Sequence, residues 1–438
     1  MRCLGIDIGS SSIKGAILNL QSGQVERISK ETFPDPLPGL PPGFHEVDSS
    51  LVLNRTVSVI RQLLADASDV RQIVFCGQMG GVILTDAASR PVTNYLSWRD
   101  QRSLQPLDGS TTPLLEEIEQ RLSPNLFADL GRELKPGTAT VLLHWLARHN
   151  QLPAGTIPVS IGDFVVGSLC GVTPTMHRTH TIGMLNLRTS DWHREAFAVL
   201  GLDQLQWPEL ANDGIPIGQC TIDGRTLDVF TVMGDQQAAL KGIQLTKDEL
   251  SINVSTGSQV SQITSQFQPS NCQTRCWFGT DYLNTITHIP AGRSLTVIEA
   301  LLTELPRAAG IAVPNSWKLI SEATERASGG GLSCDLSFFA SAMGNSGRID
   351  HITTENLTVG NLFQAAFEFM ADSYLTCSRR LSDSPTWSRI AISGGLVQAF
   401  PSLRQKLQKR FSWPMREVAE QEETMMGLLY WAREVANG

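Results

Sequence analysis

The sequence predicts an α/β protein built from two similar domains that flank a deep cleft. The chain has 438 residues, which is more than one ordinary hydrophobic core accommodates. A pattern of strand, small-residue bend and strand opens the chain and returns in its second half. Helical spacing follows both occurrences, as expected for two sheets with crossover helices. We place the domain boundary near residue 243, between residues 1–243 and residues 244–438.

The first half is predicted to begin with three strands joined by turns rich in Gly and Ser. These strands should cover about residues 2–8, 12–20 and 24–33. The segment 48–50 offers N-caps to a helix that continues to about residue 66. Two further strands are expected at 71–76 and 82–85.

From about residue 105 to residue 215 the pattern is mostly helical. The spacing of apolar residues predicts helices at 114–122, 140–149 and 164–169. Asp163 is the candidate N-cap of the last of these helices.

The second half repeats the opening pattern, with strands near 228–233, 249–255 and 258–264. A helix-rich region should follow, in which residues 361–379 show the clearest helical spacing. The chain should close with a strand, a turn and two helices, at 387–392, 393–395, 403–410 and from about 422. Because the order of elements repeats, the interface of the two domains is the expected ligand cleft.

Composition places the chain among ordinary globular proteins, with 41% hydrophobic and 18% charged residues. The formal net charge is −8 and no block of Lys or Arg is present, so we expect no nucleic-acid partner. No apolar run is long enough to span a bilayer, and the start lacks the features of a signal peptide, which predicts no membrane partner. Eight scattered cysteines fit a reducing compartment, so we expect a cytoplasmic protein.

Two bends rich in Gly, Ser and Thr predict a site for a phosphate and its metal. They lie at residues 9–12 and 255–258, and the acidic residues near them are Asp7 and Asp235. Small side chains let backbone N–H groups approach phosphate oxygens closely. Mg²⁺ prefers oxygen ligands and needs only one or two carboxylates. The pattern therefore predicts phosphoryl transfer, which depends on positioning and charge neutralisation more than on covalent chemistry.

Several motifs, in order along the chain, resemble a known family. Residues 5–14 (GIDIGSSSIK) look like the first phosphate motif of the actin, heat-shock-protein and sugar-kinase superfamily. Residues 234–237 (GDQQ) and 255–258 (STGS) resemble the matching parts of the FGGY carbohydrate kinases. The resemblance implies two ribonuclease H-like domains and transfer of the γ-phosphate of ATP, with Mg²⁺, to a sugar hydroxyl. The partners would be a small-molecule sugar and ATP, bound by a monomer or a homodimer.

By this resemblance, three segments bind the nucleotide and its metal. Asp7 would hold hydrated Mg²⁺ together with Asp235, unless Asp7 is only a hairpin-turn residue. The phosphates would lie against the two bends and the adenosine against residues 393–398 (SGGLVQ), although each segment could also be a plain turn. The candidate cofactor-binding residues are Gly9, Ser10, Ser11, Ser12, Lys14, Thr256, Gly257, Ser258, Gly394, Gly395 and Gln398.

Asp235 is the candidate catalytic residue. The resemblance implies that it accepts the proton of the sugar hydroxyl as this hydroxyl attacks the γ-phosphate. Help of this kind from a general base is typically worth roughly 10²–10⁴ in rate. The alternative role, capping the helix that begins with Gln236, would aim the carboxylate and so is compatible with catalysis.

Acceptor recognition is expected from the first domain. Residues 77–81 (GQMGG) resemble the Gly-Gln-Met-His-Gly loop of pentulose and heptulose kinases, with Gly80 in place of the histidine. Residues 98–102 (WRDQR) resemble the family's Trp-x-Asp-x-Arg element, although its Trp could pack in the core and its Asp and Arg could form a structural salt bridge. The candidate substrate-binding residues are Gln78, Met79, Trp98, Asp100, Arg102, Asp235 and Gln236.

Among the branches of the family, the chain most resembles sedoheptulokinase, because residues 138–146 lack the usual Lys, residues 234–237 read GDQQ and residues 161–166 read IGDFVV. The expected acceptor is therefore a ketose, with sedoheptulose first. The alternatives are xylulose, ribulose or another polyol, or a catalytically silent sensor of the same fold. His177 and His180 could suggest a metal pair, but we expect a surface or cleft-edge role for them.

Overall fold

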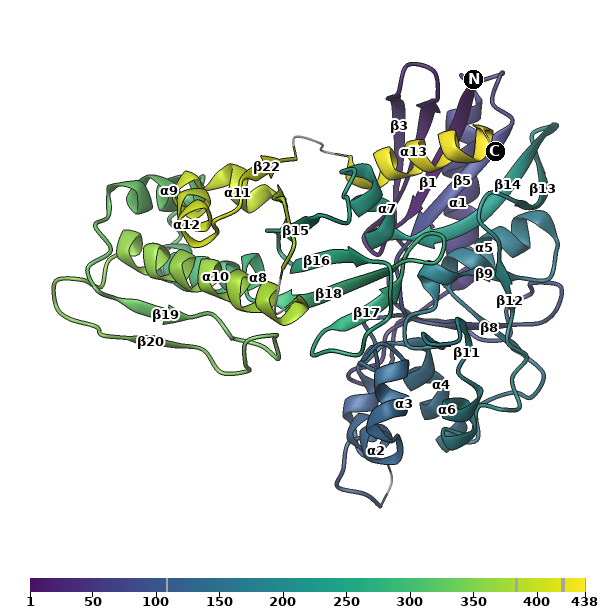
Figure 1. The fold of residues 1–438 in the computed structure, drawn as a ribbon, viewed down its shortest axis with the longest axis horizontal. Helices are drawn as coiled ribbons and strands as arrows, with labels where there is room; N and C mark the ends of the chain where they lie inside the picture. The colour runs from purple at the N-terminus through teal and green to yellow at the C-terminus, as the bar shows by residue number, and fades with distance from the viewer. Residues whose placement is uncertain (108, 383–384, 419–421, 438) are drawn as a thin grey trace.

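Two six-stranded sheets, one in each half of the chain, form the framework of the computed structural model (Figure 1). The structure describes residues 1–107, 109–382, 385–418 and 422–437. Each sheet and its helices form a separate lobe, with α7 (Asp235–Gly242) and α13 (Glu423–Asn437) near the junction of the lobes. The predicted α/β class is confirmed.

The first sheet has the strand order β13-β14-β5-β1-β2-β3. β1 to β3 form an antiparallel meander, whereas β5 runs parallel to β1, and β14 runs parallel to β5. The strands predicted for residues 2–33 and 71–76 are confirmed to within one residue, and β13 was not predicted. The bounds are β1 Arg2–Ile8, β2 Ser12–Asn19, β3 Gln24–Thr32, β5 Gln72–Gly77, β13 Pro216–Ile222 and β14 Arg225–Gly234.

The alternation of side chains along the strands gives the first sheet two packed faces. One face packs against α1 (Ser49–Leu64) and α5 (Ile161–Cys170), and the other packs against α7 and α13. Side chains two residues apart share a face, so Asp7 lies on the same face as Cys3, which packs with α13. The sheet itself therefore directs the Asp7 carboxylate toward the last helix of the chain.

The segment between β5 and β13 differs from the mostly helical prediction. Among its described residues, five α-helices are interspersed with strands of two or three residues, and the strand predicted at 82–85 is among them. The other short strands carry too few residues to display alternation in the sequence. α5 begins at Ile161 because Ser160, and not Asp163, is its N-cap. The bounds in this part are β4 Glu46–Val47, β6 Ile83–Thr85, β7 Tyr95–Leu96, η1 Arg102–Leu104, α2 Leu114–Arg121, α3 Pro124–Asp129, α4 Ala139–Arg148, β8 Ile157–Val159, β9 Thr175–His177, η2 Arg178–His180, β10 Leu185–Asn186, β11 Asp191–Trp192, α6 Arg194–Val199 and β12 Glu209–Ala211.

The second sheet repeats the plan of the first. Its strand order is β17-β18-β16-β15-β21-β22, with β15, β16 and β18 antiparallel in turn, while β21 and β22 extend the sheet in parallel from β15. β17 and β18 lie in the region predicted to be rich in helix, and β18 is largely buried, so it lacks the alternation of a half-exposed strand. The bounds are β15 Glu249–Asn253, β16 Ser258–Thr264, β17 Gln273–Cys276, β18 Tyr282–Ile289, β21 Arg389–Ser393 and β22 Met415–Glu417.

Helices of the second lobe pack on one face of this sheet around α10, whose predicted core at residues 361–379 is confirmed. No helix in the described ranges is long and apolar enough to cross a bilayer. The remaining bounds are α8 Gly292–Ala308, α9 Ser316–Arg326, β19 Ser333–Asp335, β20 Arg348–Asp350, α10 Val359–Leu381, α11 Gly395–Ala399 and α12 Pro401–Arg410.

The last helix, α13, packs in the first lobe, whereas the sequence prediction placed it in the second domain. α13 packs against the first sheet and against α7, and its core includes Met425 and Leu428. Two glycines permit this close approach. A Cβ added to Gly427 would lie 1.8 Å from the Ala238 carbonyl oxygen, and one added to Gly242 would lie 1.9 Å from that of Glu423. The first lobe therefore consists of residues from both ends of the chain.

We expect Gly427→Ala to destabilise the protein, although Ala is intrinsically the better helix former. The added methyl group cannot be accommodated against the backbone of α7, and overpacking of this kind costs about 1–3 kcal/mol. Urea denaturation would measure the loss. Gly395→Ala is the matched control, because Gly395 also lies in a helix and nothing lies within 4 Å of its added Cβ. Equal stability of the two variants would contradict the prediction.

Candidate active site

Three parallel strands of the first sheet end at the same edge and bring predicted functional residues together. Gly77, at the end of β5, is paired with Ile8 of β1 on one side and with Gly234 of β14 on the other. Asp7 precedes the first of these partners and Asp235 follows the second. The two carboxylates, far apart in the sequence, thus lie at one edge, where α/β sheets commonly bind ligands.

Asp235 binds its proton much more tightly than an ordinary aspartate. Burial, and then the nearby charge of Asp7, raises the pKa of Asp235 to about 7. Burial also raises the pKa of Asp7, while a hydrogen bond from Thr424 and the charge of Lys14 act in the opposite direction. A carboxylate with a pKa near 7 is well matched to general-base catalysis at neutral pH.

Asp7 is suited to hold a divalent cation. Its Oδ2 accepts a hydrogen bond from Thr424 Oγ1 at 2.9 Å, whereas its buried Oδ1 has no partner among the described residues. A hard cation such as Mg²⁺ takes oxygen ligands and retains waters, so Asp7 with Asp235 nearby fits it. In the described ranges no three His, Cys, Asp or Glu side chains gather to hold a metal, which leaves waters and phosphate oxygens to complete the coordination.

A buried series of hydrogen bonds fixes the turn that carries Asp235. The Gly234 N–H donates to Thr179 Oγ1 at 2.9 Å, and this hydroxyl lies 2.7 Å from His177 Nδ1. His177 Nε2 contacts Asp213 Oδ1. Because the Thr179 N–H also donates to Nδ1, we assign Nδ1 as the acceptor and Nε2–H as the donor to Asp213. The series extends from Asp213 to the residue before Asp235.

Sequence reasoning missed this series. His177 and His180 are both buried, so the surface or cleft-edge role expected for them is wrong. His177 uses its two ring nitrogens for Thr179 and Asp213, which explains its position without a metal. Asp213 lies 36 residues from His177, and only the fold brings the two together.

Both predicted phosphate bends leave room for an anion. In the β1–β2 bend the Gly9 N–H donates to the Ser12 carbonyl at 3.1 Å, and Ser11 is exposed. In the β15–β16 bend Thr256 and Gly257 are exposed, and a Cβ added to Gly257 would meet nothing within 4 Å. Backbone N–H groups at such open bends can bind phosphate oxygens.

The side chains of Ser258 and Lys14, both predicted to bind the cofactor, have partners within the protein. The Ser258 hydroxyl is buried, donates to the Ser255 carbonyl at 2.9 Å and accepts from the Tyr374 hydroxyl at 2.8 Å. It therefore supports the bend from the inside. Lys14 lies on β2, directly opposite Asp7 on β1, and its Nζ pairs with Glu422 Oε2 at 2.6 Å.

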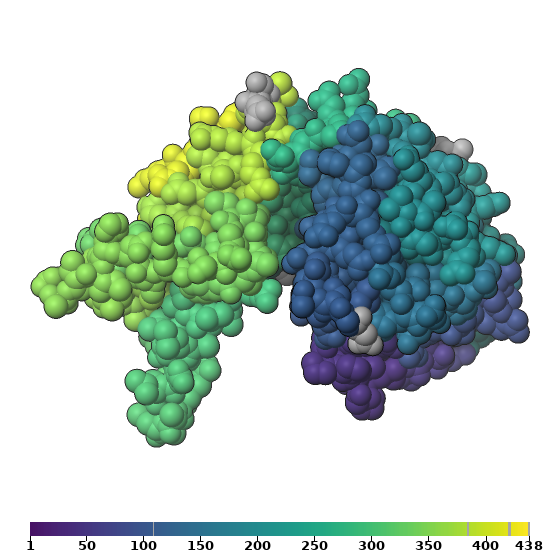
Figure 2. All heavy atoms as spheres, turned by 90° about the horizontal axis from the view of Figure 1, so that it is seen from below, coloured from purple at the N-terminus to yellow at the C-terminus, as the bar shows by residue number. Residues whose placement is uncertain are grey.

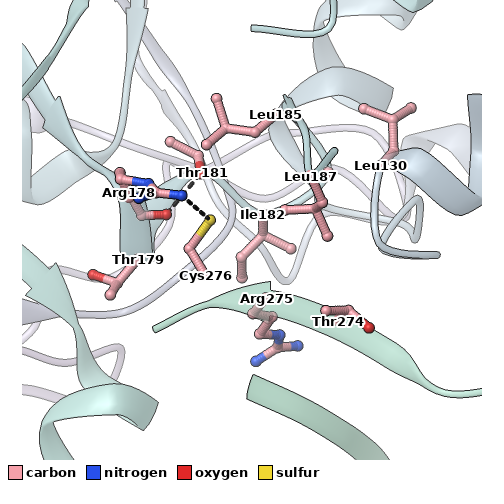
Figure 3. Close-up of a pocket in the computed structure, with 11 residues that line it drawn as sticks. Leu130, Arg178, Thr179, Thr181, Ile182, Leu185, Leu187, Thr274, Arg275 and Cys276 are labelled. Atoms are coloured by element: carbon pink, nitrogen blue, oxygen red, sulfur yellow. Dashed lines mark hydrogen bonds between the residues drawn. The ribbon is translucent and has the colours of Figure 1, made fainter. Parts of the chain in front are cut away.

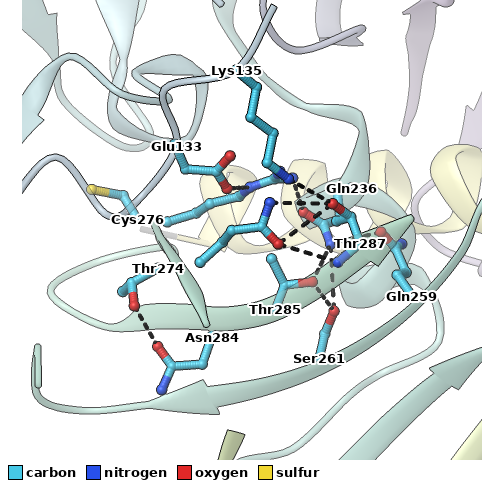
Figure 4. Close-up of polar contacts among 12 residues, drawn as sticks. Glu133, Lys135, Gln236, Gln259, Ser261, Thr274, Cys276, Asn284, Thr285 and Thr287 are labelled. Atoms are coloured by element: carbon cyan, nitrogen blue, oxygen red, sulfur yellow. Dashed lines mark hydrogen bonds and ion pairs between the residues drawn. The ribbon is translucent and has the colours of Figure 1, made fainter. Parts of the chain in front are cut away.

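Gln236 links the two lobes through a polar network (Figure 4). Its Nε2 donates to Gln259 Oε1 on β16 at 3.1 Å, and its Oε1 accepts from Arg275 on β17. Arg275 also pairs with Glu133 of the first lobe. The amide of this predicted substrate-binding residue is thus satisfied by protein groups. Because Gln259 directly follows the bend at 255–258, this network places Asp235 at the same junction as the bend.

The segment that resembles an adenosine motif lies at the end of β21, beside this bend. β21 runs parallel to β15, and Asn253 Nδ2 donates to Ser393 Oγ at 3.0 Å. Gly394 has a φ of 101°, and its added Cβ would lie 2.3 Å from the Val254 carbonyl oxygen, so glycine is required there. Gly395 and Gln398 are exposed beside it. The motif and the bend thus adjoin each other at one edge of the second sheet.

A cavity of about 860 Å³ opens between the lobes and contains part of the predicted acceptor site. Figure 2 shows the hollow between the first and second lobes. Met79, Trp98 and Asp100 line its first-lobe wall, and residues of β17 and β18 line the other. Gln78 is buried, and its Nε2 has no partner in the part of the chain that the structure describes. The volume is ample for a sugar-sized ligand.

Gly80, which stands in place of the family histidine, packs closely against the Trp98 loop. It has a φ of 79°, and its added Cβ would lie 3.1 Å from Trp98 Cβ. Arg102 is fully buried, pairs with Asp100 at 2.8 Å and with Glu46 at 2.7 Å, and does not line the cavity. The structural salt bridge considered from the sequence is therefore present, and it anchors the loop that carries Trp98.

A second, enclosed cavity of about 10 Å³ lies between η2 and β17 (Figure 3). Arg178 crosses it with Nη2 at 3.9 Å from Cys276 Sγ, and leucine side chains from the first lobe close it. This volume holds one water molecule at most, so the cavity cannot bind substrate.

Comparison with known proteins places this chain in a family. A model of the N-terminal domain of the FGGY family of carbohydrate kinases matches residues 2–242. Since this match covers more than half of the chain, the protein belongs to the FGGY family of carbohydrate kinases.

The relatives include kinases for different acceptors. A glycerol kinase from Janthinobacterium sp. (strain Marseille) is 25% identical over 259 residues, 55% of this chain and 49% of the relative. A xylulose kinase from Staphylococcus xylosus is 26% identical over 225 residues, 50% of this chain and 44% of the relative. The chain spans about half the length of these curated relatives. A solved xylulose kinase from Lactobacillus acidophilus shares the fold, with a TM-score of 0.86 at 17% identity over 100% of this chain and 89% of that one.

Thr179→Val should destabilise the protein, because the substitution keeps the shape of the side chain but leaves the buried Gly234 N–H without its acceptor. An orphaned buried donor costs about 1–3 kcal/mol. Thr179→Ser keeps the hydroxyl and should stay closer to the wild type. Chemical denaturation of the three proteins measures the difference, and a valine variant as stable as the serine variant would refute the hydrogen-bond series.

Asp235→Asn should stabilise the protein at neutral pH and above. A carboxyl group with a pKa of about 7 in the folded state and 3.8 in the unfolded chain disfavours folding as the pH rises from about 4 to 7, and this penalty then levels off. The shift corresponds to at most about 4 kcal/mol. Denaturation at about pH 5 and about pH 8 should show a larger gain at the higher pH, and a gain independent of pH would contradict the raised pKa.

Proposed function

We propose that the chain is an ATP- and Mg²⁺-dependent kinase that transfers the γ-phosphate to a hydroxyl of a ketose-type acceptor. The observation that carries this proposal is the position of Asp235. Its carboxylate, with a pKa raised to about 7, lies at the edge it shares with Asp7 and is joined through Gln236 to the strand behind the bend at 255–258. A base, a metal ligand and an anion-binding bend at one junction are the parts that phosphoryl transfer requires.

In the proposed reaction, the acceptor oxygen forms a bond to the γ-phosphorus while the bond from that phosphorus to the bridging oxygen of ADP breaks. ADP leaves with the electron pair of the broken bond, and Asp235 accepts the hydroxyl proton. Asp7 would hold Mg²⁺, which would supply positive charge against the phosphates. The backbone at Thr256 and Gly257 binds phosphate oxygens, and the hydrogen bond from Gly234 to Thr179 keeps the base in place.

The acceptor binds, in this proposal, against the first-lobe wall of the 860 Å³ cavity, at Met79 and Trp98. The flat face of a Trp side chain can pack on the C–H surface of a sugar. The sequence resemblance favours sedoheptulose, while the relatives include glycerol and xylulose kinases. A panel of heptuloses, pentuloses and polyols, assayed by ADP release, separates these acceptors.

Asp235→Ala should bind nucleotide and lose phosphorylation of the acceptor, by roughly 10²–10⁴ in turnover, because no group remains to accept the proton. Coupled ADP release measures turnover, and calorimetry measures nucleotide binding.

In the wild type, kcat/KM should rise with pH up to about 7 as Asp235 loses its proton.

Asp203→Ala is the control, since Asp203 is exposed and lies outside the cavity lining. Turnover by the Asp235 variant at the level of this control would refute the role of the base. Binding of both ligands by the wild type with no ADP formed would instead support a silent sensor.

A further inference from the structure

The cavity between the lobes carries an excess of unpaired positive charge. Its wall contains two acidic residues, Asp100 and Glu133, and each is already paired with an arginine. Five basic side chains on the wall have no carboxylate within 4.0 Å in the described ranges, namely Arg99, Arg132, Lys135, Arg293 and Arg380. The chain as a whole has a net charge of −8. The cavity wall therefore carries a charge opposite to that of the whole protein, which favours binding of an anion.

Two of these cations adjoin the bends that we assign to the phosphates of the nucleotide. Arg99 Nη2 donates to Ser10 Oγ at 3.1 Å, in the first bend. The backbone N–H of Arg293 donates to the Thr256 carbonyl at 3.3 Å, in the second bend, and its guanidinium lies 4.4 Å from the centre of the Phe339 ring. The phosphates of a bound nucleotide would therefore supply the negative charge that Arg99 and Arg293 lack.

Lys135 and Arg132 lie elsewhere, on the first-lobe wall with the acceptor residues. Gly137 follows two residues after Lys135, and a Cβ added to it would lie 1.9 Å from the Trp98 carbonyl oxygen. The carbonyl of Gly137 also accepts the Gly81 N–H at 2.7 Å. The loop that carries Lys135 is thus packed directly on the Trp98 and Gly81 loops, so its charge belongs to the acceptor side of the cavity.

The protein leaves these two cations poorly satisfied. Lys135 Nζ donates to Thr287 Oγ1 at 3.3 Å, and burial and the charge of Arg275 lower the pKa of Lys135, while Glu133 raises it. The buried Nε of Arg132 has no partner among the described residues. Glu133, the carboxylate whose charge acts on Lys135, is already paired with Arg275, so a bound anion would relieve the cost of burying these cations.

We infer that the acceptor carries an anionic group, a carboxylate or a phosphate, which Lys135 and Arg132 bind while Asp235 takes the proton of the reacting hydroxyl. This inference rests on the proposed phosphoryl transfer and adds the charge of the acceptor to it. Arg275 connects the two ends of such a ligand, because it pairs with Glu133 beside Lys135 and contacts Gln236 beside Asp235. The bonds formed and broken are those of the proposed reaction, and the anionic group itself does not react.

The experiment compares acceptors in matched pairs that differ in charge. The pairs are sedoheptulose 7-phosphate with sedoheptulose, ribulose 5-phosphate with ribulose, and gluconate with glucitol. Turnover is followed by ADP release, and binding is followed by calorimetry without ATP. The anionic member of at least one pair should be preferred by on the order of 10- to 100-fold, the strength of a hydrogen bond to a charged group. Preference for a phosphate or for the carboxylate identifies which anion is bound.

Lys135→Met should remove this preference by raising the KM of the anionic acceptor on the order of 10- to 100-fold without changing the KM of ATP. Lys135→Arg should restore most of the binding, because it restores the charge. Lys318→Met is the control, since Lys318 is exposed on α9 and lies outside the cavity lining.

Equal use of both members of every pair would overturn the inference and leave the proposed kinase standing. A Lys135→Met variant that weakens ATP and not the acceptor would also overturn it, because the cations would then serve the nucleotide. If no acceptor yields ADP, the proposed function fails. Calorimetry then still decides, because anionic members that bind the wild type and not Lys135→Met support the anion site, and the absence of such a difference overturns it.

Discussion

The parallel pairing of β1, β5 and β14 is the constraint on which the candidate site depends. It ends three strands at one edge, so Asp7 and Asp235 lie close enough for the charge of one to raise the pKa of the other. Two neighbouring, partly buried carboxylates disfavour folding, and such an arrangement persists when the rest of the structure supports it. A bound cation, or a proton on one of the two carboxylates, would relieve the repulsion between them. The site is therefore poised for chemistry at a cost in stability.

The position of α7 turns this local constraint into a property of the whole molecule. The helix begins with Asp235, packs through Ala238 against the first sheet and α13, and packs through Leu240 and Ile243 against the second sheet. Backbone contacts that only glycine allows hold it against α13. Movement of the lobes relative to each other would therefore pass through the helix that carries the base. This coupling suits an enzyme whose cleft closes to exclude water.

Charge is distributed unevenly between the cleft and the rest of the surface. An acidic chain with a basic cavity attracts anions to one place and repels them elsewhere, which raises the local concentration of an anionic ligand at the cavity. Different cations thus lie beside the positions proposed for the nucleotide and for the acceptor. Arg99 and Arg293 stand beside the bends assigned to the nucleotide, whereas Lys135 and Arg132 stand beside Trp98.

The α/β class and the repeated opening pattern could be predicted from the sequence, because strand alternation is a local property. The roles of Asp7, Asp235 and the bend at 255–258 are predictions from the chemistry of small and acidic residues, which is local as well. The strands of two or three residues between 95 and 211 could not be predicted, since they are too short to show alternation. The same holds for the four-residue strand β17, and the largely buried strand β18 lacks alternation. Contacts between distant segments were decided by the tertiary structure alone. They bring Asp213 to His177, return α13 to the first sheet, and bury Arg102 against Glu46. Periodicity records which face a residue occupies, but which other segment covers that face depends on the packing of the whole chain.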